Sequence, residues 1–281
     1  LHAWPKDDGG TRPISVQSAL IRFAEHVALL LVDPAAVESL LVPEQYGVGR
    51  GTERCFHEAA SWTEREDDDT LGVLLLDFSN AFNAANRSEM VRLVYAEPAL
   101  QPIWGIVTLT LGSPTRVTLF DAKGSPFHTV QSRQGVRQGA VLAPLLFSLL
   151  LNKGLTSVKR QFGEVVAYLD DATKLVRKSH VRSAGTIDGY ITRVMQSFAG
   201  TDLDLNARKT VLLLRPNQTL PGDYTPTLCQ PRRGVTRLLG APYGWWDDAA
   251  SCGAARQFVA EVVEADVRAG DGVRVPAAAA D

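Results

Sequence analysis

The sequence predicts a protein of the α+β class. In Val165–Val176, two short runs rich in valine and leucine flank a pair of adjacent aspartates, which is the pattern of a β-hairpin. Thr115–Phe120 and Phe127–Ser132 alternate and form a second hairpin pattern around a turn. Apolar residues recur at helical spacing elsewhere, as in Leu142–Lys159 and Val181–Phe198. Hairpins and long helices together indicate an α+β fold.

Composition sets broad limits on function. With 281 residues, the chain can bury a sizeable core as one large domain or two small ones. Its hydrophobic content of 45% and charged content of 21% are ordinary for a globular protein. The formal net charge of -2 gives no sign of nucleic-acid binding, although a neutral protein can carry a basic channel.

Cysteine usage and the apolar runs bear on location. Cys55, Cys229 and Cys252 are few and widely spaced, which suits a reducing compartment and matches no zinc pattern. The longest apolar runs, near Ala28–Val32 and Leu145–Leu151, are far shorter than a bilayer span, and no signal peptide is visible. We therefore expect an intracellular protein, nuclear or cytoplasmic, that is not secreted and has no membrane partner.

The N-terminal part of the chain predicts a hairpin, two helices and a glycine-rich loop. Lys6–Ser15 is a polar turn followed by an extended X-Pro step. Val16–Val32 has helical spacing and ends at Asp33–Pro34. Gln45–Thr52 carries three glycines before the helix Glu53–Trp62. Such a loop can cradle a phosphate, but it matches neither phosphate-binding fingerprint, so a plain turn is the preferred interpretation.

The middle and C-terminal parts add a buried strand and several helices. Leu71–Leu76 is a strongly apolar run of strand length that ends in Asp77. The other predicted elements are helices at Arg87–Ala96, Leu100–Leu111 and Ala249–Ala269, a turn and strand at Leu203–Leu214, and a turn-rich element at Leu238–Gly244.

Asp170 and Asp171 occupy the turn of the first hairpin. Two neighbouring carboxylates between half-buried strands repel each other unless a cation or a proton lies between them. A hard divalent cation with oxygen ligands meets that need and calls for a further carboxylate. Asp77, at the end of its strand, is the candidate for that third carboxylate. The alternative is an acidic turn facing water, because aspartate is a common turn residue.

Taken in order, these segments resemble the reverse transcriptase family. The matching segments are R-P-I-S and Q-Y-G-V-G-R-G-T-E in the fingers, L-L-L-D-F-S-N-A-F (motif A), R-Q-G-V-R-Q-G-A-V-L-A-P-L-L-F (motif B), A-Y-L-D-D (motif C), L-N-A-R-K-T (motif D) and L-L-G-A-P-Y-G (primer grip). Each is modest alone, but their order and separation are family-like over nearly the whole chain. The resemblance is to enzymes of non-LTR retrotransposons and group II introns.

This resemblance implies the right-hand polymerase fold, with an antiparallel palm sheet packed on helices. The expected domains are fingers at 1–70 with part of 112–135, palm at 71–111 and 136–236, and the primer-grip region with the start of a thumb at 237–281. The segment after Gly244 is too short for a complete helical thumb, so the thumb would be truncated or absent.

The implied activity is RNA-directed DNA polymerisation, a nucleotidyl transfer from dNTPs to the 3′-hydroxyl of a DNA primer on an RNA template. Two Mg²⁺ ions would serve the reaction, with Mn²⁺ as the alternative ion. Asp77 and Asp170 would ligate both ions, and Asp171 would assist and balance charge. The backbone carbonyl of Phe78 would also reach a metal, as the equivalent residue does in the family.

The nucleotide pocket follows from the same resemblance. Phe82 stands at the family's steric gate, where a ring would clash with a ribose 2′-hydroxyl; the alternative is a plain core residue. Gln138 and Gly139 would shape the pocket.

Basic residues complete the implied site. Arg12 and Lys6 would grip the triphosphate, for which the fork of arginine is well suited, while Lys6 could equally be a solvated loop lysine. Lys209 would protonate the leaving pyrophosphate, or else be an exposed lysine at a turn whose cap is Asn206.

Departures from the family pattern leave the three carboxylates in place. Ala143 replaces the usual serine before Pro144, and Asn80 stands where an acid is sometimes found.

Two rival functions remain. One is a truncated or degenerate copy that binds RNA without polymerising. The other is an RNA-dependent RNA polymerase, which Phe82 and the Tyr-Leu-Asp-Asp turn disfavour.

Overall fold

The computed structural model describes the backbone at 2–5 and 11–14, and residues 17–65, 67–121, 123–216, 218–220 and 224–245 in full. The predicted helix Ala249–Ala269 and residue Lys6 lie outside these ranges. In chain order the elements are β1 (His2–Pro5), β2 (Thr11–Ile14), α1 (Ala19–Leu30), α2 (Pro34–Leu40), α3 (Thr52–Ser61), β3 (Thr70–Leu76), α4 (Ala81–Ala84), α5 (Arg87–Ala96), η1 (Pro98–Leu100), α6 (Gln101–Leu111), β4 (Thr115–Phe120), β5 (Pro126–Ser132), α7 (Ala143–Phe162), β6 (Val165–Tyr168), β7 (Asp171–Arg177), α8 (Lys178–Ala184), α9 (Ile187–Gln196), β8 (Val211–Leu214), β9 (Gln230–Arg233), β10 (Val235–Leu238) and β11 (Ala241–Gly244).

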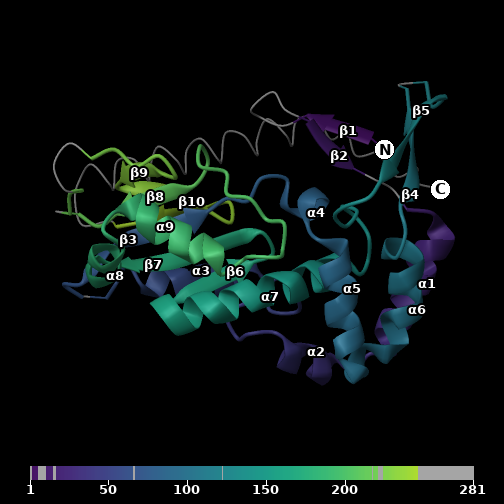
Figure 1. The fold of residues 1–281 in the computed structure, drawn as a ribbon, viewed down its shortest axis with the longest axis horizontal. Coiled ribbons are helices and arrows are strands. Elements are labelled where there is room, and N and C mark those ends of the chain that lie inside the picture. Colours follow the sequence, from purple (N-terminus) through teal and green to yellow (C-terminus); the bar gives the residue numbers. More distant parts are fainter. Residues whose placement is uncertain are drawn as a thin grey trace, which may run out of the picture.

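A five-stranded sheet with the order β6-β7-β3-β8-β9 lies at one end of the molecule, in the left half of Figure 1. The apolar run of β3 lies in the middle and pairs antiparallel with both β7 and β8. The expectation of an antiparallel sheet is wrong for one pair, because β9 runs parallel to β8. Parallel neighbours need a long crossover, and the chain between Leu214 and Gln230 supplies one.

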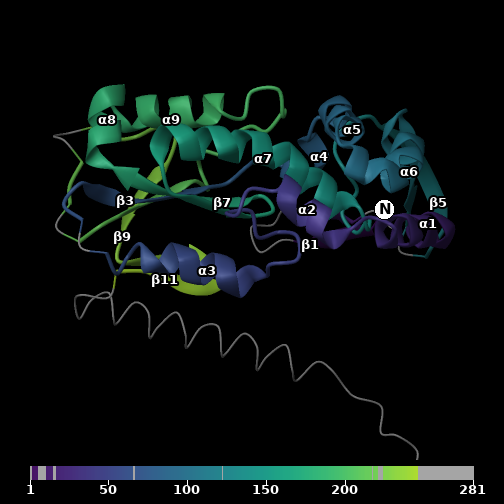
Figure 2. The ribbon, with the colours of Figure 1, turned by 90° about the horizontal axis from the view of Figure 1, so that it is seen from below.

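Helices and a hairpin cover the two faces of this sheet. Figure 2 shows α7, α8 and α9 on one side, and α3 with the β10–β11 hairpin on the other. Successive residues of a strand point to opposite faces. Leu74 and Leu76 of β3 therefore join the larger core under α7 and α9, whereas Val73 joins the smaller core with Trp62 and Tyr243. The sheet is buried on both faces, which explains why the β3 run lacks polar alternation.

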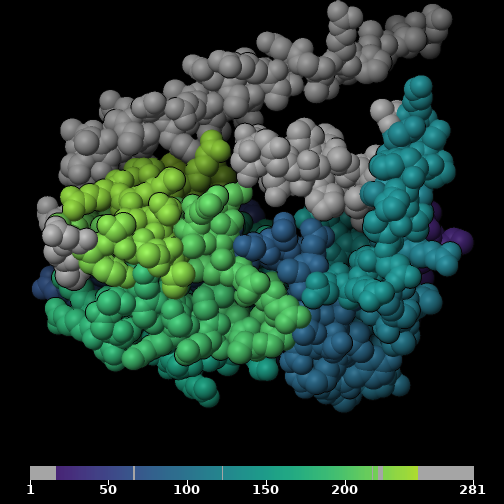
Figure 3. Space-filling view, turned by 45° about the horizontal axis from the view of Figure 1, so that its top comes forward, coloured from purple at the N-terminus to yellow at the C-terminus, as the bar shows by residue number. Residues whose placement is uncertain are grey.

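Two smaller hairpins and the α1, α5 and α6 helices make up the other end of the molecule (Figure 1). The predicted β4–β5 hairpin is confirmed, with Thr115 opposite Ser132, and it projects from the body in the teal part of Figure 3. The N-terminal hairpin is confirmed as antiparallel pairing of β1 with β2. In the described part of the chain, no helix has the length and apolar character needed to cross a bilayer.

Two helix predictions need correction. The single helix expected at Val181–Phe198 is two helices, because Gly185 has φ of 83° and ends α8. The Thr186 hydroxyl then accepts from the Gly189 N–H at 3.0 Å and starts α9. The first helix region ends before Asp33 as expected, but the Asp33 carboxylate also caps α2, a helix that was not predicted from the sequence.

Candidate active site

Strand register brings the three aspartates to one end of the sheet. Leu76, the last residue of β3, pairs with Ala172 of β7, so Asp77 and Asp171 follow as neighbours across the two strands. Tyr168 pairs with Asp171 and closes a two-residue turn that contains Asp170. We call Tyr168–Asp171 the aspartate turn. The strand register therefore places Asp77 beside the hairpin aspartates, as the sequence predicted.

A cavity of about 960 Å³ opens beside the three aspartates. The residues that line it include most of those singled out from the sequence: Asp77, Phe78, Phe82, Gln138, Gly139, Asp170, Asp171 and Lys209. Asn206 and Asn80 also line it. The other two predicted residues are not among the described residues that line the cavity. Lys6 lies outside the described residues, and Arg12 lies in β2 opposite Trp4 with only its backbone described.

The charge balance of the site favours a cation. The pKa of Asp171 is raised to about 6, mainly by burial among surrounding protein atoms and in addition by the negative charges of Asp170 and Asp77. Its side chain is nevertheless open to the cavity, so this carboxylate is accessible while being crowded by negative charge. Such a cluster is relieved by a proton or by a metal ion.

The donor set fits a hard divalent ion. No group of three His, Cys, Asp or Glu side chains in the described ranges is arranged to hold a metal by itself. Mg²⁺ does not require such a cage, because it is commonly bound through one or two carboxylates together with waters and substrate phosphates. Asp77, Asp170 and Asp171, which line one cavity and interact electrostatically, are the residues that would hold it.

Residues 204–210 fasten the end of β3. The Asp77 N–H donates to the Thr210 hydroxyl at 3.2 Å, and the Asn206 N–H donates to the Asp77 carbonyl at 2.8 Å. The Lys209 N–H in turn donates to the Asn206 carbonyl at 3.0 Å, which forms the turn predicted there. This arrangement fixes the backbone of Asp77 and places Lys209 on the rim of the same cavity. Thr210 is fully buried and was not singled out from the sequence.

Phe82 is both a core residue and a cavity residue. Its ring stacks on Phe147 of α7 with centroids 4.4 Å apart, and it also lines the cavity. Its carbonyl accepts from the Val136 N–H at 2.7 Å. Gly135 has φ of 68°, and a Cβ there would lie 2.3 Å from the Phe82 carbonyl oxygen. The loop before Gln138 is thus locked to the backbone of Phe82.

Arg87 holds the same loop from its other side. Its guanidinium donates to the Gly135 carbonyl at 2.6 Å, the Ser132 carbonyl at 2.8 Å and the Ser132 hydroxyl at 2.7 Å. Burial lowers the pKa of Arg87, and the nearby charge of Arg137 lowers it further. Because arginine stays charged in proteins, these bonds are charge-assisted and rigid.

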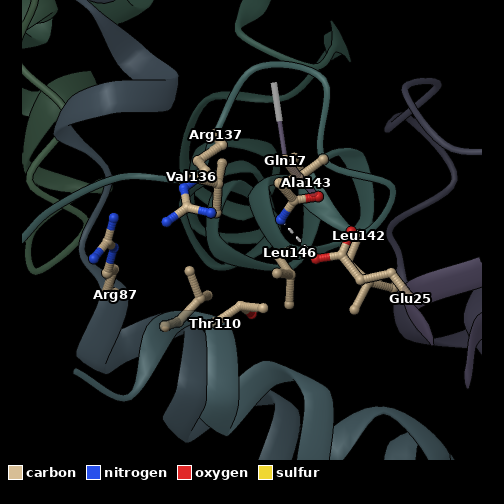
Figure 4. A pocket seen from close by; sticks show the side chains of 11 residues that line it. Gln17, Glu25, Arg87, Thr110, Val136, Arg137, Leu142, Ala143 and Leu146 are labelled. Atoms are coloured by element: carbon tan, nitrogen blue, oxygen red, sulfur yellow. Dashed lines mark hydrogen bonds between the residues drawn. The ribbon is translucent and has the colours of Figure 1, made fainter. Parts of the chain in front are cut away.

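A buried glutamate ties α1 to the loop that carries Gly139. Figure 4 shows Glu25 meeting Gln17 beside Leu142, with Arg87 on the opposite side of a small pocket. Glu25 is 2% exposed; its carboxylate accepts from the Gln17 side-chain amide at 3.0 Å and from the Val141 N–H at 2.9 Å. The sequence offered no sign of this contact, since an isolated glutamate in a helix usually faces water.

The aspartate turn itself contacts the glycine-rich loop. Leu169 has φ of 55°, a left-handed conformation that leucine rarely adopts. Its N–H lies 3.3 Å from the side-chain oxygen of Gln45, which is fully buried. On the strand that follows, Lys174 is also fully buried, and its ammonium nitrogen donates to the Leu175 carbonyl.

Lys174 has an unusual environment for a lysine. Burial lowers its pKa to about 7; Glu164 opposes this change and Arg177 adds to it. The burial of Lys174 was not predicted from the sequence, because periodicity cannot distinguish an exposed lysine from an inward-facing one.

Comparison with known families decides the assignment. The model of the family described as Reverse transcriptase (RNA-dependent DNA polymerase) matches residues 4–241. The chain belongs to the reverse transcriptase family. Reverse transcriptases use divalent metal ions, in agreement with the donor set described above. The α+β fold expected for this family is likewise confirmed.

Curated relatives of this reverse transcriptase come from retrotransposable elements. The Retrotransposable element SLACS 132 kDa protein of Trypanosoma brucei gambiense is 37% identical over 171 residues, which is 60% of this chain and 14% of that protein. The Retrovirus-related Pol polyprotein from type-1 retrotransposable element R2 of Popillia japonica is 28% identical over 214 residues, 71% of this chain and 29% of that protein. These matches confirm the resemblance to non-LTR enzymes, and the chain spans less than a third of either relative.

Two solved telomerase structures are similar to the reverse transcriptase chain. Apo telomerase from Candida tropicalis, truncated from the C-terminal domain, has a TM-score of 0.47 and 12% identity, covering 83% of this chain and 51% of that one. Telomerase from Candida albicans, in complex with a fragment of telomeric RNA, has a TM-score of 0.47 and 11% identity, covering 81% of this chain and 36% of that one.

Proposed function

We propose that the chain is an RNA-directed DNA polymerase that adds dNTPs to the 3′-hydroxyl of a DNA primer on an RNA template. One observation carries the proposal: the register of β3 and β7 puts Asp77 beside Asp171 at the edge of a large cavity. Membership of the reverse transcriptase family supports the reaction class. The five-stranded sheet would be the palm, with fingers at 1–70 and part of 112–135 and a primer grip from 237 onwards.

The three aspartates would hold two Mg²⁺ ions, with Mn²⁺ as the alternative. Asp77 and Asp170 would contact both ions, and Asp171 and the Phe78 carbonyl would assist. When bound, such ions stabilise the attacking and leaving oxygens of an in-line displacement at phosphorus. The negative charge that raises the pKa of Asp171 supports this assignment, because a bound cation would remove the repulsion.

The other residues of the cavity would select and position the nucleotide. The Phe82 ring, immobilised on Phe147, would exclude a ribose 2′-hydroxyl. Gln138 and Gly139 would form the wall of the pocket. Lys209 would give a proton to the departing pyrophosphate, for which its place on the cavity rim is suitable.

The triphosphate would be gripped from the N-terminal hairpin. Arg12 of β2 is assigned to this role because its guanidinium fork matches phosphate oxygens. Lys6 would add a second positive charge.

Primer extension on an RNA template with dNTPs and Mg²⁺ tests the proposal. We expect extension by the wild-type chain and none above background by Asp170→Asn, which keeps the shape of the side chain and removes its charge. Equal activity of the two proteins would refute the metal assignment. Extension with NTPs in place of dNTPs would identify an RNA polymerase, and binding of primer-template without extension would identify an RNA-binding protein.

A further inference from the structure

The glycine-rich loop that precedes α3 lies against the edge of the five-stranded sheet. The Tyr46 N–H donates to the Ala167 carbonyl at 2.8 Å, and the Ala167 N–H donates to the Glu44 carbonyl at 2.9 Å. Gln45 thus forms a one-residue parallel bridge with Ala167 of β6. The bridge lies on the outer edge of β6, since β7 pairs with its other edge. We call Glu44–Gly47 the edge segment. It reaches the aspartate turn from a part of the chain that motif C does not include.

The aspartate turn needs support from outside its own hairpin. Leu169 has φ of 55°, and residues other than glycine, asparagine and aspartate rarely adopt this left-handed backbone conformation. Such backbone strain persists only where the surrounding structure holds it, and it is common at functional sites. Because Asp170 is the next residue, whatever fixes the backbone of Leu169 also fixes the backbone position from which the Asp170 side chain extends.

Gln45 supplies the polar part of that support. Its side-chain oxygen accepts from the Gly47 N–H at 2.8 Å and lies 3.3 Å from the Leu169 N–H. The side chain is fully buried, and its amide nitrogen has no hydrogen-bond partner among the described residues. The acceptor oxygen is therefore the part of Gln45 that joins the edge segment to the aspartate turn.

Gly47 supplies the steric part. A Cβ at this position would lie 2.6 Å from Leu169 Cδ2 and 2.8 Å from the Leu169 backbone nitrogen. The second contact is with backbone, so a side-chain rotation alone could not relieve it. The next glycine differs: Gly49 has φ of 75°, and a Cβ there would meet nothing within 4 Å.

We propose that Gln45 and Gly47 are positioning residues that set the direction of Asp170 by holding Leu169 in its left-handed conformation. This proposal rests on the proposed polymerase function and extends it to a segment that motif C does not contain. The glycine-rich loop then acts on the aspartate turn, a role that was not considered from its sequence.

Three variants of the full chain test this proposal: Gly47→Ala, Gln45→Met and, as the matched control, Gly49→Ala. We expect Gly47→Ala and Gln45→Met to lower kcat about 10- to 100-fold with an unchanged KM for dNTP, because the metal-binding carboxylate is displaced and the nucleotide pocket is not. Gly49→Ala should lose some thermal stability, because alanine is strained at positive φ, and keep the wild-type kcat. Wild-type kcat in Gly47→Ala and Gln45→Met would overturn the proposal, and so would an equal loss in Gly49→Ala.

Binding of Mn²⁺ without nucleotide, measured by electron paramagnetic resonance, separates this proposal from the polymerase function. We expect Gly47→Ala and Gln45→Met to weaken Mn²⁺ binding about 10-fold and Gly49→Ala to leave it unchanged. If the wild type extends no primer but shows this pattern, the polymerase function fails and the positioning role stands. If Gly47→Ala does not fold, Gln45→Met, which adds no atom near Leu169, decides, and unchanged Mn²⁺ affinity in that variant would overturn the positioning role.

Discussion

Because of Lys174, the free energy of unfolding of the protein should rise with pH. The lysine is fully buried on β7, and burial lowers its pKa from 10.5 to about 7. Between these two values the unfolded chain binds a proton that the folded chain does not. Because stability rises with pH wherever the unfolded state binds more protons, raising the pH from 7 towards 10 removes a penalty on folding. Lys174→Met keeps the length of the side chain and removes the titrating group.

The size of the effect follows from the two pKa values. The gap between 10.5 and about 7 corresponds to about 4 to 5 kcal/mol in total. About 2 kcal/mol of this should be recovered between pH 7 and pH 9. Lys174→Met should therefore be more stable than the wild type at pH 7, and its advantage should shrink by about 2 kcal/mol at pH 9.

Urea unfolding of both proteins at pH 7, 8 and 9 measures this difference. Comparing the variant with the wild type at each pH cancels the titration of groups that the two proteins share. A difference that stays constant over this range would mean that Lys174 is charged in the folded protein. The proposed neutral state of the buried amine would then be wrong.

Substitutions at three further residues probe the cavity and the contacts that support the loop beside it. Phe82→Ala should raise incorporation of ribonucleotides relative to deoxynucleotides, measured by single-nucleotide extension. An unchanged ratio of the two incorporation rates would mean that Phe82 has only a structural role. Glu25→Ala should raise the KM for dNTP about 10-fold by releasing the Val141 N–H. Glu25→Gln should keep a KM near the wild-type value, since its amide can still accept from Val141, and equal KM values for both Glu25 variants would contradict the contact. Arg87→Met should lower the free energy of unfolding by about 2 to 4 kcal/mol, because buried carbonyls lose their donors, and a loss below about 0.5 kcal/mol in chemical denaturation would show that the loop holds without it.

The sequence predicted the parts of the site that depend on local pattern. A run of apolar residues ending in Asp77 and a hairpin with Asp170 at its turn are each visible within about ten residues. The same apolar run predicted a buried strand, which the structure confirms as β3, paired with a neighbour on each side. The meeting of these two segments could be proposed because like charges demand a shared cation, and the register of β3 and β7 agrees.

Other contacts depend on tertiary structure and could not be predicted. Glu25 and Val141 are 116 positions apart, and Gln45 and Leu169 are 124 apart, so no local pattern links them. The parallel pairing of β9 depends on a long crossover whose direction is set by packing. The division of the predicted helix at Gly185 was visible in principle, because Gly-Thr is a helix stop followed by a cap.

The pairing of β3 with β7 makes the site depend on residue count as well as on residue type. Deleting one residue from either strand would shift the pairing by one step and turn every following side chain to the other face. Asp77 would then no longer stand beside Asp171, although both would remain in the sequence. A diverged copy with such an in-frame deletion would keep each motif intact and lose the constellation. When related copies are compared, the spacing between a motif and the buried end of its strand is therefore as informative as the aspartates themselves.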